Sequence, residues 1–158
     1  MWGEKKVSVI FPTYNEKNSI REAIEDFFAS GYVDEVVVVN NNAAEGTDEE
    51  VKQTNARLVY EAKQGYGHAI QKGLAEAEGD ILIIAEPDGT FSGHDVVKLL
   101  AYSDDVPVVF GTRTQREFVW EGANMGFFLK WGNWAVGKMM EFLRLLTACY
   151  VEHPEVVR

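Results

Sequence analysis

The chain has 158 residues, of which 46% are hydrophobic and 25% are charged, a composition that indicates one globular domain and excludes a disordered chain. Its 25 Asp and Glu residues outnumber 15 Lys and Arg residues, so the formal net charge is −10 and nucleic acid is not an expected partner. A single cysteine, Cys149, excludes an internal disulfide and a cysteine-cluster zinc site.

The acidic charge is unevenly distributed. Residues 1–105 carry 9 basic and 20 acidic side chains, whereas residues 106–158 carry 6 and 5. The polar N-terminal residues run directly into a strand pattern, so we expect no signal peptide and synthesis in the cytosol. No stretch reaches the ~20 uninterrupted apolar residues of a spanning helix.

The first part of the chain alternates strand and helix patterns. The short β-branched run 7–11, closed by Pro12, predicts a buried strand. Ser19 and Glu22 predict a capping box at the start of a helix whose apolar residues recur with helical spacing. Four consecutive valines, 36–39, indicate a strand covered on both faces.

This alternation continues to residue 110. The pattern predicts helices over residues 48–53, 66–77 and 95–101. It predicts strands over residues 57–60, 81–85 and 106–110. Five strands separated by helices indicate an α/β fold, in which an open, mostly parallel sheet has helices on both faces. Ligands of such sheets bind beyond the carboxyl ends of the strands, so candidate site residues are those that directly follow a strand.

Polar and aromatic residues follow the first strand, in the order Pro12, Thr13, Tyr14, Asn15, Glu16. The absence of a glycine-rich turn from this sequence disfavours a classical dinucleotide site. A ring, an amide and a carboxylate in a row suit stacking on a flat ring and accepting hydrogen bonds from it. A plain polar loop is the alternative interpretation.

Three asparagines beginning at Asn40 follow the second strand, and a purely structural turn is the simpler explanation for them. Gly65 precedes the next long helix, where free backbone amides can meet a phosphate, and a plain helix start is the alternative interpretation. Glu86 and Asp88 follow the fourth strand, and unpaired carboxylates at a buried strand end are costly unless a cation neutralises them. Mg²⁺ or Mn²⁺ fits such ligands. Arg113 offers a guanidinium to phosphate, although a lone Arg is more often part of a surface ion pair.

Five segments in unbroken order over residues 6–147 resemble family-2 glycosyltransferases of the GT-A, Rossmann-like fold: VSVIFPTYNE, VDEVVVVNNNAAEGT, KQGYGHAIQKGL, GDILIIAEPDGTF and VVFGTR. The synthases of polyprenyl-phosphate (dolichol-phosphate) sugars are the most similar branch. The resemblance implies a nucleotide-sugar donor, a UDP- or GDP-sugar, and a divalent cation at Glu86 and Asp88, which stand at the Asp-x-Asp motif. It implies that Asn40 stands where the family has an Asp that receives the N–H of the base.

The implied site residues fall into three groups. The substrate-binding candidates are Pro12, Thr13, Tyr14, Glu16, Asn40, Gly65, Glu86 and Lys130, the catalytic candidates are Asp88 and Arg113, and the metal ligands are Glu86 and Asp88. Replacing the usual Asp by Asn40 removes a charge, which should weaken base binding by roughly 1 kcal/mol. Replacing the usual Asp by Glu86 lengthens one metal ligand by a methylene.

The acceptor is inferred from the residues after Arg113. They lack the Glu-Asp pair that family members with sugar acceptors carry. A lipid phosphate is already ionised and needs no general base, which favours a polyprenyl phosphate over a glycan as the acceptor. The alternatives of a glycan acceptor, a non-catalytic nucleotide-sugar-binding or scaffold relative, and a nucleotidyltransferase stay open.

Residues 124–150 interleave Trp and Phe with Lys and Arg, which suits a helix in a membrane interface, although a core helix or a homodimer helix fits equally well. We therefore expect a nucleotide-sugar-binding core over 1–123, an acceptor-side helix over 124–150 with Lys130 near the acceptor phosphate, and a polar tail over 151–158. The expected location is cytoplasmic, peripheral on the cytosolic face of a membrane. Family members usually continue past 146–147, so the chain is expected to be truncated on its acceptor side.

Overall fold

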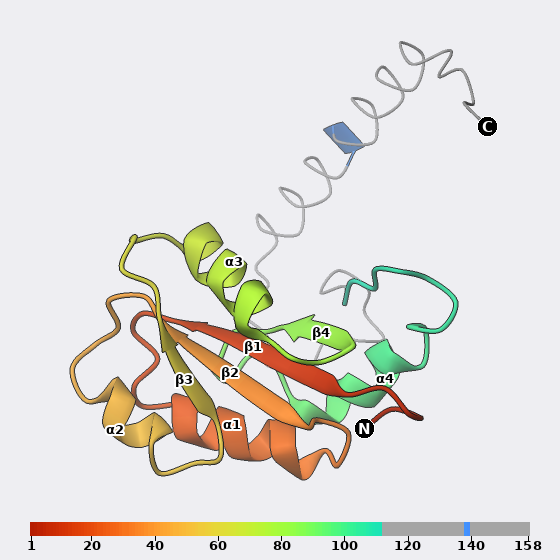
Figure 1. Ribbon diagram of the computed structural model, residues 1–158, viewed down its shortest axis with the longest axis horizontal. Coiled ribbons are helices and arrows are strands. Elements are labelled where there is room, and N and C mark those ends of the chain that lie inside the picture. The colour runs from red at the N-terminus through yellow and green to blue at the C-terminus, as the bar shows by residue number, and fades with distance from the viewer. Residues whose placement is uncertain (112–137, 140–158) are drawn as a thin grey trace. The chain divides into compact units, whose positions relative to one another are not determined.

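The computed structural model describes residues 1–111 and 138–139, and its four strands form one parallel sheet (Figure 1). The strands are β1 (Val7–Thr13), β2 (Glu35–Asn40), β3 (Arg57–Tyr60) and β4 (Ile81–Ile84), in the spatial order β3-β2-β1-β4. The helices are α1 (Ile20–Ala29), α2 (Thr47–Val51), α3 (Tyr66–Glu76) and α4 (Val96–Leu100), with a 3-10 turn over Gly93–Asp95 before α4. These bounds agree with the predicted helices to within a few residues.

Different helices cover the two faces of the sheet, as Figure 1 shows. Val36 and Val38 pack in a core shared with α1 and α4, whereas Val37 and Val39 pack with Ala69 of α3. All four valines are fully buried. The structure therefore confirms the expected parallel sheet with helices on both faces, and the strand buried on both sides.

The helix α3 lies very close to the sheet at Gly73. A Cβ atom at this position would stand 2.3 Å from Cγ2 of Ile10 and 3.1 Å from Cγ2 of Val39. Because both side chains are fully buried and β-branched, neither has room to move. A glycine at this position therefore sets how closely α3 packs on β1 and β2.

The strand β1 continues through Pro12 to Thr13, two residues past its predicted end. The carbonyl of Ile10 accepts a hydrogen bond from the N–H of Ala85, so the backbone of Ile10 faces β4. Two residues later the backbone of Pro12 faces the same side, where β4 has already ended at Ile84. No N–H is needed at that point, so a proline fits within the strand.

The predicted capping box of Ser19 and Glu22 is wrong, although α1 does begin at Ile20. The Ser19 hydroxyl donates instead to the carbonyl of Pro87 (2.6 Å), with the carbonyl of Glu16 as a second, longer acceptor (3.2 Å). Its backbone has φ −109° and ψ −18°, whereas a capping residue lies outside the helical region. Ser19 therefore joins the loop after β1 to the loop after β4.

Residues 106–110 do not form the predicted fifth strand. Val106, Val108 and Phe110 are 45%, 63% and 88% exposed, and β4 is the outer strand of the described sheet. An apolar run satisfies the strand pattern, but a strand forms only where a neighbour completes its backbone hydrogen bonds. This segment has no such neighbour among the described residues.

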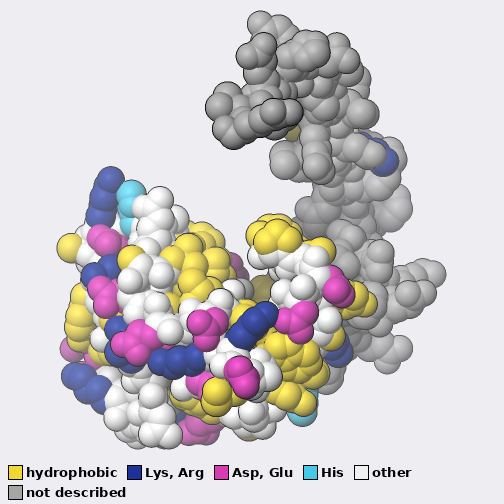
Figure 2. All heavy atoms as spheres, turned by 45° about the vertical axis from the view of Figure 1, so that its right-hand side comes forward, with side chains coloured by type: hydrophobic (Ala, Val, Ile, Leu, Met, Phe, Trp, Pro, Cys, Tyr) yellow, Lys and Arg dark blue, Asp and Glu magenta, His cyan; other side chains and the backbone are white. Residues whose placement is uncertain are grey.

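Within residues 1–111, the strand β4 is packed against the core on one face only. Ile81 and Ile83 pack against the core shared with α1, whereas Leu82 and Ile84 are 39% and 43% exposed. The helix α3 lies over β1 and β2 and leaves this part of the sheet open. Figure 2 shows the surface of the described unit from one side, with Lys and Arg next to Asp and Glu and hydrophobic side chains between them.

The predicted acceptor-side helix over 124–150, the tail over 151–158, Arg113 and Lys130 lie outside the described residues, apart from Lys138 and Met139, which are helical. Within the described part of the chain, no helix combines the length and the apolar character needed to span a membrane.

At the amino ends of the strands, the carboxylate of Glu35 joins three segments. Its side chain is 11% exposed, and it accepts hydrogen bonds from the Ser8 hydroxyl, the Glu78 N–H (2.9 Å) and the Arg57 guanidinium (2.9 and 3.1 Å). Burial alone would raise the pKa of Glu35, but these hydrogen bonds and the charge of Arg57 hold its pKa below the usual 4.5. Glu35 thus links β1, β2, β3 and the turn before β4 in its ionised form.

Glu35→Gln should lower the free energy of unfolding by roughly 2 kcal/mol near neutral pH. This is less than the ~3–5 kcal/mol of a fully buried pair because Arg57 is 37% exposed. Since the folded-state pKa of Glu35 is lowered, its contribution is complete above pH 4.5 and is lost as the pH falls through that lowered value. Urea unfolding at about pH 7 and about pH 3 should show the variant losing less stability on acidification than the wild type. Equal losses would contradict this assignment.

Candidate functional site

A cavity of about 340 Å³ lies beyond the carboxyl ends of the strands. It is lined by Pro12, Thr13, Tyr14, Glu16, Asn41, Gln64, Tyr66, Ala69, Glu86 and Asp88. The structure therefore brings together the residues predicted after the first and fourth strands. Asn40 and Gly65 are not among the lining residues, and the cavity has Asn41 and Tyr66 in their place.

The loop after β1 is shaped by the carboxylate of Glu16. Its Oε2 atom accepts hydrogen bonds from the backbone N–H groups of Tyr14 (2.6 Å) and Asn15 (2.8 Å). The carbonyl of Tyr14 in turn accepts from the N–H of Ala44 in the loop after β2 (2.7 Å). The Tyr14 ring is 52% exposed at the cavity, so it offers a flat face to a ligand.

Strand alternation decides which asparagine reaches the cavity. Successive side chains of β2 point to opposite faces of the sheet, and Val39 packs on the side of α3 while Val38 packs on the side of α1. Asn41 follows Val39 by two residues, so it lies on the same face as Val39 and lines the cavity. Asn40 follows Val38 by two residues and lies on the face of Val38. The alternation of side chains along β2 could be derived from the sequence, and it would have predicted that Asn41 lines the cavity.

The side chain of Asn40 bonds the loop and helix that come after β2. Its Nδ2 donates to Oδ1 of Asp48 in α2 (2.6 Å), and its Oδ1 accepts from the N–H of Ala43 (2.8 Å). Tyr60 donates its hydroxyl to the other oxygen of Asp48 (2.7 Å), and this bond raises the pKa of Tyr60. An amide at position 40 suits Asp48, because a second carboxylate there would repel it.

Glu86 and Asp88 form an acidic wall of the cavity. Asp88 is exposed, and its Oδ1 accepts hydrogen bonds from the N–H (2.9 Å) and the hydroxyl (2.6 Å) of Thr90. Gly89, with φ +81°, allows the turn that brings Thr90 back to Asp88. Partial burial, a hydrogen bond to Glu86 and the charges of both carboxylates raise the pKa of Tyr66, as expected where the local potential is negative.

The residues present fit a divalent cation shared with a substrate. Among the residues that the structure describes, no three His, Cys, Asp or Glu side chains are grouped so as to hold a metal by themselves. Mg²⁺ is commonly held by one or two carboxylates and completed by substrate phosphates. Glu86 and Asp88 supply such a pair at one wall of a cavity that has room for a ligand.

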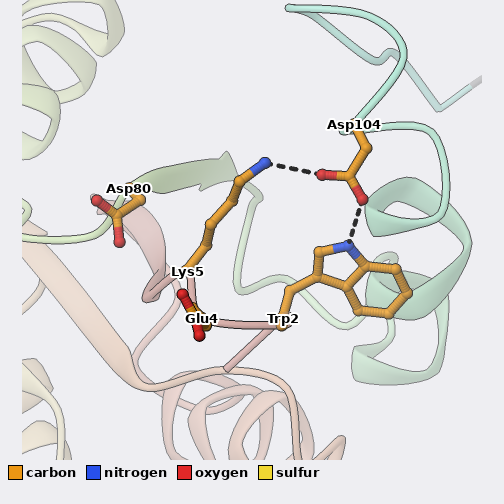
Figure 3. Close-up of a pocket in the computed structure, with 6 residues that line it drawn as sticks. Trp2, Glu4, Lys5, Asp80 and Asp104 are labelled. Atoms are coloured by element: carbon orange, nitrogen blue, oxygen red, sulfur yellow. Dashed lines mark hydrogen bonds and ion pairs between the residues drawn. The ribbon is translucent and has the colours of Figure 1, made fainter.

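A second, larger hollow of about 620 Å³ lies at the amino ends of the strands (Figure 3). Two of its charged groups pair with each other: Lys5 Nζ lies 2.7 Å from Oδ1 of Asp104, and the Trp2 indole N–H donates to Oδ2 of Asp104 (3.4 Å). Ligands of parallel α/β sheets bind at the opposite ends of the strands. We therefore assign the functional site to the cavity that contains Asp88.

Comparisons with known proteins identify a matching family and several similar proteins. A model of the family described as "Glycosyl transferase family 2" matches residues 8–145. The glycosyltransferase AglJ of Haloferax volcanii is 27% identical over 95 residues, which cover 60% of this chain and 31% of that protein. The dolichol-phosphate mannosyltransferase of Pyrococcus furiosus is 28% identical over 116 residues, covering 68% and 33%. The chain thus spans about a third of the length of these relatives.

Among solved structures, glucosyl-3-phosphoglycerate synthase of Mycobacterium tuberculosis, in complex with Mn²⁺, UDP-glucose and phosphoglyceric acid, is similar with a TM-score of 0.56. The two chains are 23% identical, and the likeness covers 63% of this chain and 39% of the synthase. The likeness confirms the expected GT-A, Rossmann-like fold.

Proposed function

The chain belongs to glycosyl transferase family 2, and on this premise we propose that its cavity binds a nucleotide-sugar, a UDP- or GDP-sugar, for transfer of the sugar with inversion. The observation that carries the proposal is the meeting of Tyr14, Glu16, Glu86 and Asp88 around one cavity at the carboxyl ends of parallel strands. An aromatic face and hydrogen-bond acceptors at one end suit a base and ribose, and carboxylates at the other suit a metal diphosphate.

In the proposed complex, one group of residues binds the nucleoside of the donor and another binds its phosphates. Pro12, Thr13, Tyr14 and Glu16 face the nucleoside, and the amides that open α3 after Gly65 lie where a phosphate can be received. Asn40 does not line the cavity, and it contributes to base binding indirectly by holding the loop after β2. Arg113 contacts phosphate, as the family likeness implies.

Glu86 and Asp88 hold Mg²⁺ or Mn²⁺ in the proposed enzyme, as suggested by the Mn²⁺ and UDP-glucose in the synthase complex. When bound, the ion supplies Lewis-acid stabilisation of the charge that develops on the departing diphosphate. Asp88 presents its carboxylate in one orientation because Thr90 bonds it twice. Without a cation, the two carboxylates would repel the diphosphate.

Asp88→Asn should reduce the Mn²⁺-dependent affinity for UDP or GDP by at least about tenfold, because one charged metal ligand is lost. Isothermal titration calorimetry with UDP, GDP and their sugars, with and without Mn²⁺, measures this directly. Asp104→Asn is the matched control, since it removes the same charge at the other hollow and should leave the affinity unchanged. Binding that does not depend on Mn²⁺, or equal loss in both variants, would contradict the proposal.

For the acceptor, we propose a polyprenyl phosphate presented at the cytosolic face of a membrane, with Lys130 near its phosphate. An ionised phosphate attacks without a general base, in keeping with the lack of a Glu-Asp pair after Arg113 in the sequence. The similarity to the Pyrococcus dolichol-phosphate mannosyltransferase supports this choice. A glycan acceptor is the competing possibility, and a transfer assay distinguishes the two.

Incubation of the protein with radiolabelled UDP- or GDP-sugars, Mn²⁺ and detergent-dispersed polyprenyl phosphate should give a labelled product that partitions into organic solvent. Mild acid should release the sugar from that product, because a glycosyl phosphate is acid-labile. Asp88→Asn should abolish the transfer. Label found only in added oligosaccharides would support a glycan acceptor, and donor binding without any transfer would support a non-catalytic relative.

A further inference from the structure

We propose that Asn41 is a positioning residue that fixes the α3 side of the donor cavity before the nucleotide binds. The inference rests on the proposed function, because it concerns the same cavity. It assigns to Asn41 the task of holding the loop between β3 and α3, whose residue Gln64 lines the cavity. That task is distinct from contact with the metal or the diphosphate.

Asn41 uses its whole amide to hold this loop. Its Nδ2 atom donates to the carbonyls of Glu61 and Lys63, both at 2.8 Å. Its Oδ1 atom accepts from the N–H of Gly65 at 2.7 Å. The side chain thus bonds three of five consecutive residues, and Asn41 is only 4% exposed.

The position of Asn41 is itself fixed by the sheet. Its backbone N–H donates to the carbonyl of Thr13 at 3.2 Å, which extends the pairing of β1 and β2 by one residue. Thr13 also donates its hydroxyl to the carbonyl of Val39. The amide of Asn41 therefore connects two buried strands to the loop after β3, in which Glu61 continues the pairing of β2 and β3 by donating its N–H to the carbonyl of Asn40 (3.0 Å).

The bond to Gly65 sets where α3 begins. Gly65 has φ +140°, a conformation that favours glycine, and α3 starts at the next residue, Tyr66. The helix has no side-chain cap from its own N-cap residue. Asn41 thus supplies from a neighbouring strand the contact that orients the first turn, and Tyr66 in that turn lines the cavity beside Glu86.

A loop ordered in advance raises affinity, because its ordering cost does not have to be met when the ligand binds. Removing the Asn41 amide leaves two carbonyls and one N–H without this partner. The loop is then held less firmly, by the bonds of Asn42 to Ala62 (3.5 Å) and Gln64 (2.8 Å). The nucleotide must then order residues 61–66 as it binds. The expected effect is a higher Kd for the donor, while the structure at the carboxyl ends of β1 and β4 stays unchanged.

The test compares Asn41→Ala and Asn41→Asp with the wild type. Asp at position 41 can still accept from the Gly65 N–H but cannot donate to the carbonyls of Glu61 and Lys63. Both folded variants should raise the Kd for Mn²⁺-UDP by about tenfold or more. In the absence of nucleotide, hydrogen exchange of the Gly65 amide should accelerate clearly in Asn41→Ala and less in Asn41→Asp. If Asn41→Ala does not fold, the affinity and loop exchange of Asn41→Asp decide the question.

Glu35→Gln is the matched control for general destabilisation. It weakens the fold at the opposite ends of the strands, so its folded fraction should bind Mn²⁺-UDP with the wild-type Kd and exchange Gly65 at the wild-type rate. An unchanged Kd and unchanged exchange in the Asn41 variants, or an equal rise of Kd in Glu35→Gln, would overturn the inference. If the wild type bound no nucleotide, the proposed function would fail, while exchange at Gly65 would still decide whether Asn41 holds the loop.

Discussion

The parallel pairing of β1 with β2 on one side and β4 on the other is the constraint on which the site depends. It brings three strand ends to one edge of the sheet, and the burial of β1 and of the four valines of β2 fixes the face to which each side chain points. Pro12 and Asn41 therefore reach the cavity on the side of α3, while Asn40 reaches α2. The loops after these strands are then joined by hydrogen bonds, such as those of Ser19 and Asn41.

The acidic charge of the chain affects which ligands can bind at this edge of the sheet. The excess of acidic residues lies within 1–105, and three of them, Glu16, Glu86 and Asp88, line the cavity proposed for the nucleotide-sugar. Two anionic partners can approach each other there only through a cation. Partial burial and the negative charges of Glu86 and Asp88 together raise the pKa of Tyr66, and the same negative charges would attract Mg²⁺ or Mn²⁺.

Much of this arrangement could be predicted from the sequence, because apolar runs and helical periodicity report burial directly. The four strands and the lining role of Tyr14, Glu16, Glu86 and Asp88 follow from such patterns and from the family likeness. The predicted strand at 106–110 and the capping box at Ser19 were wrong, because each depends on a partner distant in sequence. Asn41 was missed because a run of asparagines resembles a simple turn, and its partners Glu61, Lys63 and Gly65 are known only after folding.

Paramagnetic line broadening tests most directly whether the edge that contains Asp88 is the metal-nucleotide site. Sub-stoichiometric Mn²⁺ added with UDP should broaden the backbone amide signals of residues 13–16, 64–67, 86 and 88–90 in the NMR spectrum of the protein. The signals of Trp2, Lys5, Asp80 and Asp104 at the opposite hollow, which is also acidic, should stay sharp. Broadening centred on Asp80 and Asp104, or spread evenly over the surface, would contradict the account.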